Sequence, residues 1–382
     1  MATTAAACSP AGPVVIDPAA APAATSVGTP SGTPSPAATP APSPTGPGGV
    51  SVPSVAGTVA TGLRSPWGLA FLPDGSALVS ERDTARVVAV RPDSSLVPLG
   101  TVPDVAFGGE GGLLGLAVSP SVGTDRWLYA YHTAPDGNRV VRMALEGAQG
   151  GPVTGLGEPQ QLLAGIPASP IHNGGRLAFG PDGMLYVTTG DASDTATSQQ
   201  PGSLAGKILR LTPDGGVPED NPVPGSPVWS SGHRNVQGLA WDDQGTLWAS
   251  EFGASSWDEL NVIVPGANYG WPQAEGAGGT AAGFTDPVVA WPTDQASPSG
   301  IAATQGTVFL ASLRGQRLWA VPVGAGRAGE PQAFFTGELG RLRTVAVAPD
   351  GALWLVTSNT DGRAEPRVGD DRILRLTLAP SG

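Results

Sequence analysis

The sequence predicts an all-β fold, a six-bladed β-propeller with four-stranded blades. Turn-forming residues are abundant, with 56 glycines and 40 prolines in 382 residues, so long helices are not expected in any number. Apolar residues still make up 40% of the chain, which is enough for a large core. One pattern, a short apolar strand, a turn and a second apolar strand, occurs six times.

The turn within each copy is often spelled Pro-Asp-Gly, which favours a tight hairpin because glycine tolerates positive φ. Equivalent positions from Leu69 to Val345 are 44 to 62 residues apart, and a propeller blade needs about 40–50 residues plus loops. The copies span residues 67–81, 116–131, 177–191, 239–251, 301–312 and 345–357. Third apolar strands follow at residues 86–90, 139–143, 208–211 and 317–321.

The two ends of the repeated region carry single strands, at residues 54–60 and 372–378. A solenoid would also show regular repeats, but its terminal strands would leave open edges. A ring closed by pairing these two strands hides both edges. The sequence therefore predicts one propeller domain over residues 55–378.

The region before this domain, residues 1–50, is predicted to be a disordered tail. Residues 9–50 are almost wholly Pro, Ala, Ser, Thr and Gly, which cannot bury enough apolar surface to offset the entropy of ordering. Small residues precede Cys8, as at the lipid-attachment site of bacterial lipoproteins; an incidental cysteine is the alternative. We therefore expect an extracytoplasmic protein, secreted or tethered to a membrane through a lipidated Cys8.

Charge and composition narrow the class of partner. The net charge is −12 with only 20 basic residues and no basic cluster, so we expect no nucleic-acid partner. The acidic balance also argues against direct docking on anionic lipid. Cys8 is the single cysteine, so no intramolecular disulfide forms, and no run of 18 apolar residues suggests a membrane span. Neutral sugars or other small solutes are the easier partners.

His172 is the first candidate for catalysis among the three histidines. It lies in Pro170-Ile-His-Asn-Gly-Gly-Arg176, immediately before the first strand of the third copy, where loops of a propeller face the axis. An imidazole titrates near neutrality, so it can take a proton from a sugar hydroxyl. The alternative is a loop histidine bonded to a backbone carbonyl.

His233 and Arg234 occupy the same place one repeat later, in Ser231-Gly-His-Arg-Asn-Val-Gln237. Arginine can donate to carboxylate or carbonyl oxygens of a ligand, or pair with one of the many acids. For His132, at the end of a strand, we expect a structural or surface role.

Three further arginines, Arg314, Arg341 and Arg343, fall in loops beside first strands. In an acidic protein they indicate either an anionic ligand or solvated loop charge. The segment Glu251–Leu260 joins small residues and acids, whose oxygens suit Ca²⁺, although no regular calcium loop is present. No Cys/His cluster indicates zinc or iron, and no phosphate-binding glycine loop occurs in a fitting context.

Taken together and in order, several segments resemble the glucose/sorbosone dehydrogenase family. They are Glu110-Gly-Gly-Leu-Leu-Gly-Leu-Ala, His172-Asn-Gly-Gly-Arg-Leu, Gly232-His-Arg-Asn-Val-Gln-Gly-Leu-Ala, Asp258-Glu-Leu-Asn and Asn268-Tyr-Gly-Trp-Pro. The resemblance runs from about Val55 to Leu378. It implies a six-bladed propeller that binds pyrroloquinoline quinone (PQQ) and Ca²⁺ on its axis.

The resemblance also implies roles for individual residues. His172 would take the proton of the anomeric hydroxyl while hydride passes from the sugar C1 to the quinone, and Arg234 would face the quinone carbonyl. The backbone carbonyls of Gly253 and Ala254 would ligate Ca²⁺, with Asp258 close by. Further cofactor contacts would be Asn235, Gln237 and Thr293, with Arg314, Arg341 and Arg343 on the PQQ carboxylates. Glu110, Asp258 and Trp291 would line the sugar pocket.

The chain departs from the family's soluble glucose dehydrogenases at three positions. Glu110 stands in place of a glutamine, Ile171 in place of an aspartate, and Arg314 in place of a lysine. The sequence therefore predicts a PQQ- and calcium-dependent dehydrogenase that oxidises aldoses at C1 to lactones and passes electrons to an external acceptor. The alternative is a secreted, non-catalytic propeller that binds glycan or protein.

Overall fold

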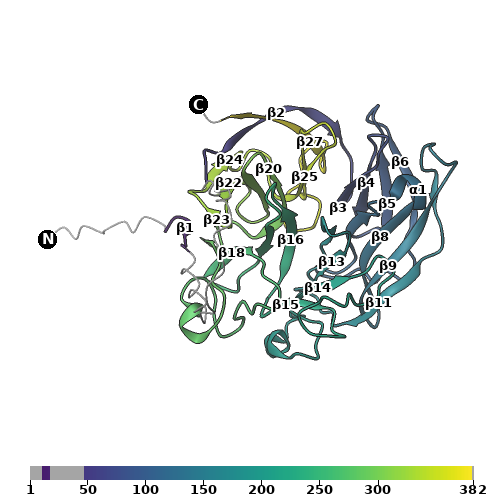
Figure 1. Cartoon of the computed structure of the whole chain (residues 1–382). Coiled ribbons are helices and arrows are strands. Elements are labelled where there is room, and N and C mark those ends of the chain that lie inside the picture. The colour runs from purple at the N-terminus through teal and green to yellow at the C-terminus, as the bar shows by residue number, and fades with distance from the viewer. Residues whose placement is uncertain (1–10, 18–46, 381–382) are drawn as a thin grey trace, which may run out of the picture.

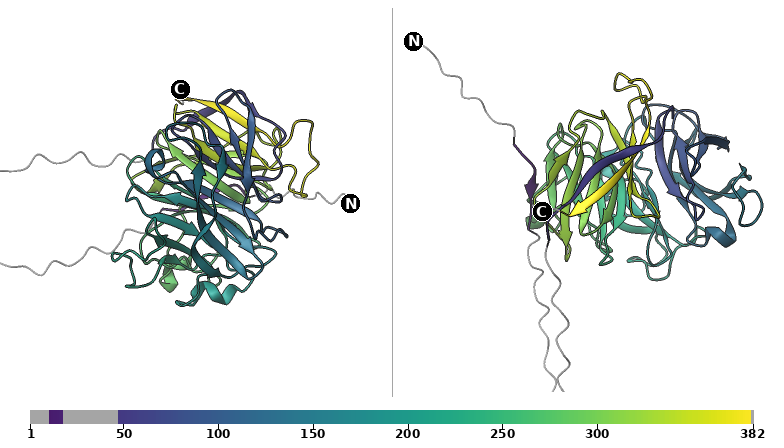
Figure 2. Two further views of the ribbon diagram at one scale, coloured as in Figure 1. Left: turned by 90° about the vertical axis from the view of Figure 1, so that its right-hand side faces the viewer. Right: turned by 90° about the horizontal axis from the view of Figure 1, so that it is seen from above.

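The computed structural model of the chain describes residues 11–17 and 47–380. Six antiparallel sheets stand around one axis like the blades of a propeller (Figures 1 and 2). The predicted six-bladed β-propeller is therefore confirmed. Within the described residues the helices are single turns, α1 (Val122–Asp125), η1 (Thr195–Gln199) and η2 (Gly279–Ala282), and none is long and apolar enough to cross a membrane.

Each blade begins with the strand nearest the axis. The six innermost strands are β3 (Pro66–Phe71), β7 (Leu113–Val118), β12 (Leu177–Phe179), β16 (Val236–Trp241), β20 (Pro298–Thr304) and β25 (Leu342–Val347). The second strands are β4 (Ala77–Glu81), β8 (Trp127–Ala134), β13 (Leu185–Thr188), β17 (Leu247–Glu251), β21 (Thr307–Ser312) and β26 (Leu353–Thr357). Each innermost strand contacts the next, and β25 contacts β3, so the ring is closed.

The third and outer strands complete the blades. The third strands are β5 (Arg86–Val90), β9 (Gly137–Glu146), β14 (Lys207–Leu211), β18 (Trp257–Val262), β22 (Leu318–Gly324) and β27 (Ile373–Pro380). The outer strands are β6 (Leu96–Thr101), β10 (Gly155–Leu156), β11 (Gln160–Ile166), β15 (Val228–Ser231), β19 (Val289–Pro292), β23 (Arg327–Ala328), β24 (Gln332–Phe334) and β2 (Ser51–Ala60).

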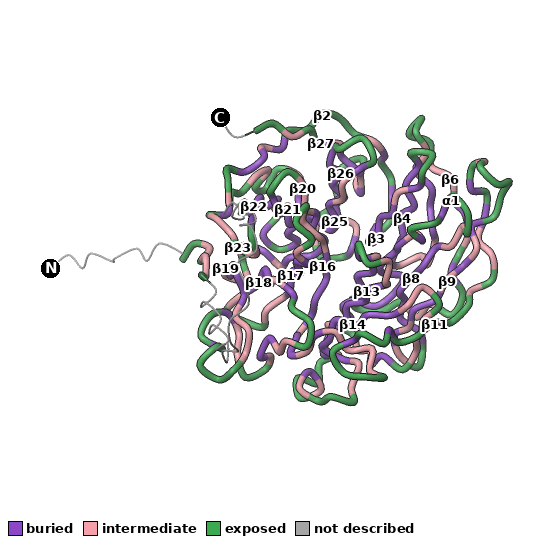
Figure 3. The backbone as a smooth tube through the Cα atoms, in the orientation of Figure 1, coloured by how far each residue is buried: buried purple, intermediate pink, exposed green. Residues whose placement is uncertain are grey.

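The core lies between the blades rather than inside any one of them. Residues of blades 1 and 2 share one apolar cluster, in which Leu78 and Val87 pack with Leu113 and Leu128. Because each sheet is covered on both faces, the second strands are continuous buried runs instead of alternating ones, as in β4 and β21. Figure 3 shows buried residues along the inner strands and exposed residues along many loops and much of the outer strand β2.

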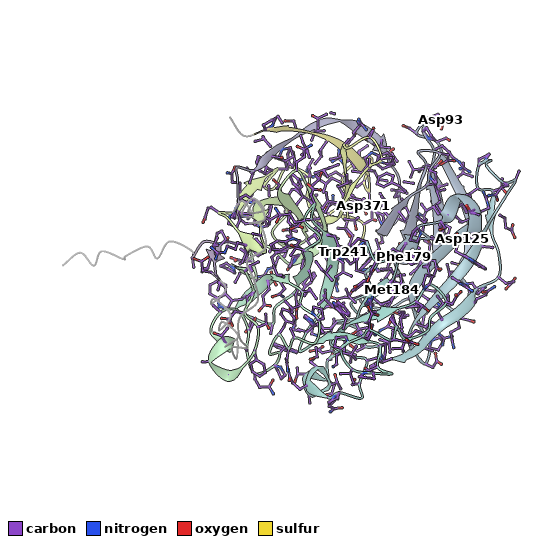
Figure 4. All side chains as sticks on the ribbon, in the orientation of Figure 1. Asp93, Asp125, Phe179, Met184, Trp241 and Asp371 are labelled. Carbon is purple, nitrogen blue, oxygen red and sulfur yellow. The ribbon has the colours of Figure 1, made fainter. Side chains whose placement is uncertain are left out.

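The predicted Asp-Gly hairpins join the first and second strands at one end of the propeller. In the first, Gly75 has φ 82° and Asp74 Oδ1 accepts the N–H of Ser76 at 2.9 Å. Phe179 and Trp241, at the ends of β12 and β16, line a depression at this end of the axis (Figure 4). The starting ends of the innermost strands, with the candidate site residues, therefore lie at the opposite end.

The ring is closed by the two terminal strands, as the sequence predicts. β2 pairs antiparallel with β27 along its whole length, from Ser51 opposite Pro380 to Ala60 opposite Ile373. The two strands run side by side in the right-hand view of Figure 2. Blade 6 therefore combines one strand from before blade 1 with the last three strands of the domain.

Residues 11–17, within the predicted tail, include a short strand. Val14 and Val15 form strand β1 (Val14–Val15), which pairs antiparallel with β19 on the outer edge of blade 4. The N–H of Ile16 donates to the carbonyl of Val288 at 2.9 Å. Val14-Val15-Ile16 is the one apolar run of the tail, and it covers a sheet edge that would otherwise be unpaired. Cys8 and residues 18–46 lie outside the described residues.

Two truncations test the ring closure. Deletion of residues 1–60 removes β2, and we expect the cooperative thermal transition to be lost because β27 then has no partner at the seam. Deletion of residues 1–17 removes only β1, and we expect the melting temperature to fall by no more than about 5 °C. Thermal melts followed by circular dichroism measure both effects. A shorter chain that lacks β2 yet melts like the full chain would contradict the closure.

Candidate active site

A cavity of about 330 Å³ opens on the axis where the innermost strands begin. Its lining includes every predicted site residue except Trp291, and the residues come from different blades. The predicted residues in the lining are Glu110, His172, Arg234, Asn235, Gln237, Gly253, Ala254, Asp258, Thr293, Arg314, Arg341 and Arg343. We call this cavity the axial well.

His172 is held in the wall of the axial well from three sides. Its backbone has φ 60°, an unusual conformation for a residue other than glycine. The backbone N–H donates to Glu110 Oε2 at 2.9 Å, and the ring Nδ1 lies 2.7 Å from Oδ1 of the buried Asp191. Asp191 Oδ2 in turn accepts the indole N–H of Trp271 at 2.9 Å. These contacts fix both the backbone and the ring.

The tautomer of His172 follows from its partners. Nη2 of Arg234 lies 2.8 Å from Nε2, and a guanidinium can only donate, so Nε2 carries a lone pair. Nδ1 must then carry the proton and donate to Asp191. Burial raises the pKa of Asp191, but hydrogen bonds from His172 and Ser193 outweigh it and hold that pKa below the ordinary value. An ionised Asp191 thus keeps the basic atom of His172, Nε2, directed at the axial well.

Asp191 was not singled out from the sequence, although a hydrogen bond that recurs in several blades marks its position. A polar acceptor at or just past the end of a second strand takes a hydrogen bond from the loop that leads into the same blade. The pairs are Glu81 with Arg64, Asp191 with His172, Glu251 with Arg234, and Asn359 with Arg341. Comparison of the repeats at this position is the signal that identifies Asp191.

Arg234 bridges two predicted functional groups. Besides its contact with His172, it donates through Nη1 to the carbonyl of Gly253 at 2.5 Å. Its guanidinium carbon lies 5.5 Å from the ring centre of Trp271, which limits its movement on that side. Arg234 thus places one positive charge between the basic atom of His172 and a carbonyl expected to bind a cation.

The blade 6 side of the axial well carries more positive than negative charge. Arg341 donates to Asp361 Oδ2 through Nε and Nη2, at 3.2 and 3.0 Å, and Arg343 lies 3.7 Å from the same oxygen. Arg343 is 3% exposed, burial lowers its pKa to about 9, and its Nε has no hydrogen-bond partner among the described residues. One carboxylate therefore serves two arginines, and a buried donor is left for an anionic ligand.

The lining also holds residues that the sequence did not single out. Arg82 is buried just past the end of β4, and Arg363 belongs to the loop between β26 and β27. Trp67 lines the well from the start of β3. No sequence motif marks Arg82 or Arg363, because their place in the well depends on which loops fold over the axis.

The loop that carries Gly253 and Ala254 is held by hydrogen bonds from its backbone N–H groups to two carboxylates. Oε1 of Glu275 accepts the N–H groups of residues 254–257 at 2.8 to 3.1 Å, and Asp258 Oδ1 accepts that of Gly253 at 2.9 Å. Burial raises the pKa of Asp258 to about 7. With the N–H groups engaged, the carbonyl groups remain for a hard cation. Across residues 11–17 and 47–380, no three His, Cys, Asp or Glu side chains gather as a metal site.

Trp291 does not form a wall of the sugar site, which corrects the prediction made for it. Its side chain is fully buried between blades 4 and 5, where its ring centre lies 5.8 Å from that of Trp319. On β19, Trp291 belongs to the apolar cluster that joins blades 4 and 5, together with Trp248 and Val308. Thr293, two residues later and past the end of β19, reaches the well instead.

The other two histidines lie outside the well. His233 is fully buried, with Nδ1 2.8 Å from Glu251 Oε2, Nε2 2.9 Å from the hydroxyl of Ser230, and its ring stacked on Tyr269. It supports the backbone that presents Arg234. His132 is buried in blade 2, where burial lowers its pKa.

Fold and site together define the class: a propeller that holds a base and a cluster of arginines in one axial well. The chain belongs to the glucose/sorbosone dehydrogenase family, whose model matches residues 63–374. It is 30% identical over 331 residues, 78% of this chain and 89% of the relative, to an aldose sugar dehydrogenase of Escherichia coli. It is 34% identical over 253 residues, 57% of this chain and 52% of the relative, to quinoprotein glucose dehydrogenase B of Acinetobacter calcoaceticus.

Solved structures show the same relationship. The PQQ-bound aldose sugar dehydrogenase of Streptomyces coelicolor is 56% identical, with a TM-score of 0.84, over 87% of this chain and 100% of that one. The apo-form aldose sugar dehydrogenase of Escherichia coli has a TM-score of 0.73 at 28% identity, over 87% of this chain and 100% of that one. The predicted family is therefore confirmed, and these relatives are sugar dehydrogenases.

A buried pair of acids beneath Arg234 makes stability depend on pH. Burial, and then the charge of Glu251, raise the pKa of Glu259 to about 8 from an ordinary 4.5. The folded chain therefore binds a proton that the unfolded chain releases between these values, and stability falls as the pH rises through this window.

We expect Glu259→Gln to flatten that dependence. The amide cannot ionise, so the melting temperature should fall less between pH 5 and pH 8 than it does in the original chain. Melts at a series of pH values measure the slope. Glu330→Gln, which changes an exposed acid, is the control and should leave the slope unchanged. Equal slopes in Glu259→Gln and the original chain would refute the assignment.

Proposed function

We propose that the chain is a PQQ- and Ca²⁺-dependent dehydrogenase that oxidises aldoses at C1 to lactones and passes the electrons to an external acceptor. One observation carries the proposal: the basic Nε2 of His172 and the arginines face one axial well. The relationship to a PQQ-bound aldose sugar dehydrogenase supports the choice of cofactor.

The residues of the axial well fit a planar molecule with three carboxylates. Arg314, Arg341 and Arg343 would hold those carboxylates, and the free Nε of Arg343 is a buried donor that such a ligand satisfies. Asn235, Gln237 and Thr293 would add polar contacts. When bound, PQQ supplies the two-electron acceptor.

Gly253 and Ala254 would hold Ca²⁺ through their backbone carbonyls, with Asp258 beside them. The loop fits this role because its N–H groups are already bound to Glu275 and Asp258. The cation, when present, supplies Lewis-acid polarisation. In the present arrangement the Gly253 carbonyl accepts a hydrogen bond from Arg234, so a cation there would replace the guanidinium.

His172 would act as the general base. Its Nε2 takes the proton of the anomeric hydroxyl, and the imidazolium that forms is stabilised by the buried Asp191 at Nδ1. The substrate hydroxyl must displace Arg234 from Nε2 to reach it. Arg234 is then free to stabilise negative charge that develops in the well.

The rim beside His172 would contact the sugar. Glu110 lines the well, binds the His172 N–H and lies 3.5 Å from Arg363 through Oε1. Its carboxylate can also accept from sugar hydroxyls. Ile171 adds an apolar surface that is 41% exposed.

The proposal is tested by adding PQQ and CaCl₂ to the apo protein. We expect a rise in melting temperature, because a ligand that binds only the folded state stabilises it. We also expect dye reduction that depends on an aldose, followed across a panel of sugars. Neither a thermal shift nor turnover with any aldose would overturn the proposal and favour the non-catalytic, glycan- or protein-binding alternative.

His172→Gln tests the base. We expect turnover to fall by about 100-fold or more, while the thermal shift caused by PQQ is retained, because the variant loses proton transfer and keeps the arginines. Steady-state dye reduction and thermal melts give the two readouts. The control is His132→Gln, which lies outside the well. Original turnover in His172→Gln would remove the base assignment.

A further inference from the structure

Arg176 fills the axis of the propeller directly beneath the axial well. It precedes β12 in blade 3 and is 7% exposed. Its Nε donates to the carbonyl of Gln237 in blade 4 at 2.8 Å, and its Nη2 to the hydroxyl of Thr344 in blade 6 at 3.2 Å. A Cβ on Gly300 of blade 5 would lie 3.1 Å from Nη2. One side chain thus reaches three other blades across the axis.

The same guanidinium stacks against the floor of the well. Its central carbon lies 4.2 Å from the ring centre of Trp67, and that of Arg343 lies 5.8 Å from the same ring. Trp67 and Gln237 line the well, so Arg176 is one layer of side chains below any ligand there. Gln237 also accepts from Arg343 Nη1 at 2.9 Å, which couples the two arginines.

Arg176 differs from other buried arginines in having only neutral partners. Arg82, Arg210 and Arg341 each pair with an aspartate. In the part of the chain that the structure describes, Arg176 has a carbonyl, a hydroxyl and an indole ring as partners and no carboxylate. Burial lowers its pKa to about 9, so it remains charged at neutral pH. An unpaired charge in a poorly solvated site acts strongly on its surroundings.

The proposed reaction adds negative charge above this floor. The C1–H bond of the sugar breaks and its hydride carries two electrons and one proton to the cofactor, while the hydroxyl proton goes to His172 and the lactone C=O forms. Negative charge would therefore lie on the cofactor, and a matching positive charge on His172, until a proton is returned to the cofactor. A fixed cation below the floor stabilises that charged state more than the oxidised one.

We propose that Arg176 is an electrostatic positioning residue that raises the reduction potential of the bound quinone. It acts through Trp67 and Gln237 and touches neither cofactor nor substrate. This inference rests on the proposed function and adds a residue that sets how readily the cofactor accepts electrons.

The test compares Arg176→Gln, Arg176→Lys and the original chain, each loaded with PQQ and CaCl₂. Spectroelectrochemical titration gives the midpoint potential of the bound cofactor, and fluorescence titration gives the affinity for oxidised PQQ. We expect Arg176→Gln to weaken binding of the reduced form at least tenfold more than that of the oxidised form. For a two-electron couple this is a fall of about 30 mV. Arg176→Lys keeps the charge and should keep most of the potential.

The matched control is Arg142→Gln, which removes an arginine stacked on Trp127 at 4.5 Å, outside the lining of the well. Its potential should equal that of the original chain. If Arg176→Gln does not fold, Thr344→Asp supplies a carboxylate beside Nη2 and should lower the potential in the same direction. An unchanged potential in the folded variant overturns the inference. Failure of the original chain to bind PQQ overturns the proposed function instead, so the two failures are distinct.

Discussion

Close approach of neighbouring innermost strands at the axis is the constraint on which the rest of the structure depends. Glycines make this approach possible. A Cβ on Gly115 of β7 would lie 2.2 Å from the carbonyl oxygen of Gly175, and one on Gly238 of β16 would lie 2.4 Å from that of Ser299. Any side chain at these points would push two blades apart. Because the strands are this close, a single arginine can span the axis, and a well of limited width remains above it.

The acidic balance of the chain and the cationic well are compatible because the acids near the well bind backbone or ring N–H groups. Asp191, Glu251 and Glu275 each hold a loop that presents a candidate functional group. The negative charges of these acids therefore fix the positions of the loops. Asp361 is shared between Arg341 and Arg343, so positive charge remains for a ligand. The net charge of −12 therefore says little about the site itself.

Much of this arrangement was predictable from the sequence, because it repeats. The Pro-Asp-Gly hairpins, the terminal strands and the place of His172 before an innermost strand follow from comparing copies of one unit. What the sequence did not reveal depends on tertiary packing. The loop of Arg363 folds over the axis, and Trp291 turns into the space between two sheets. Asp191 is intermediate, since its position near the strand end repeats but its contact with the ring of His172 is formed only in the folded blade.

The short strand within the predicted tail has a different physical origin. Composition averages over a long segment, whereas a strand needs only a few apolar residues and a free edge to pair with. Val14 and Val15 meet both conditions on β19. A compositional average over a long segment therefore does not exclude a strand at a short apolar run within it.

Strand β1 has a dynamic consequence. It joins the rim of blade 4 by two residue pairs, whereas β2 joins the seam of blade 6 from Ser51 to Ala60. Because β1 is held by far fewer strand hydrogen bonds than β2, the edge of blade 4 opens more readily than the seam of blade 6. β1 can therefore separate from blade 4 while the ring stays closed.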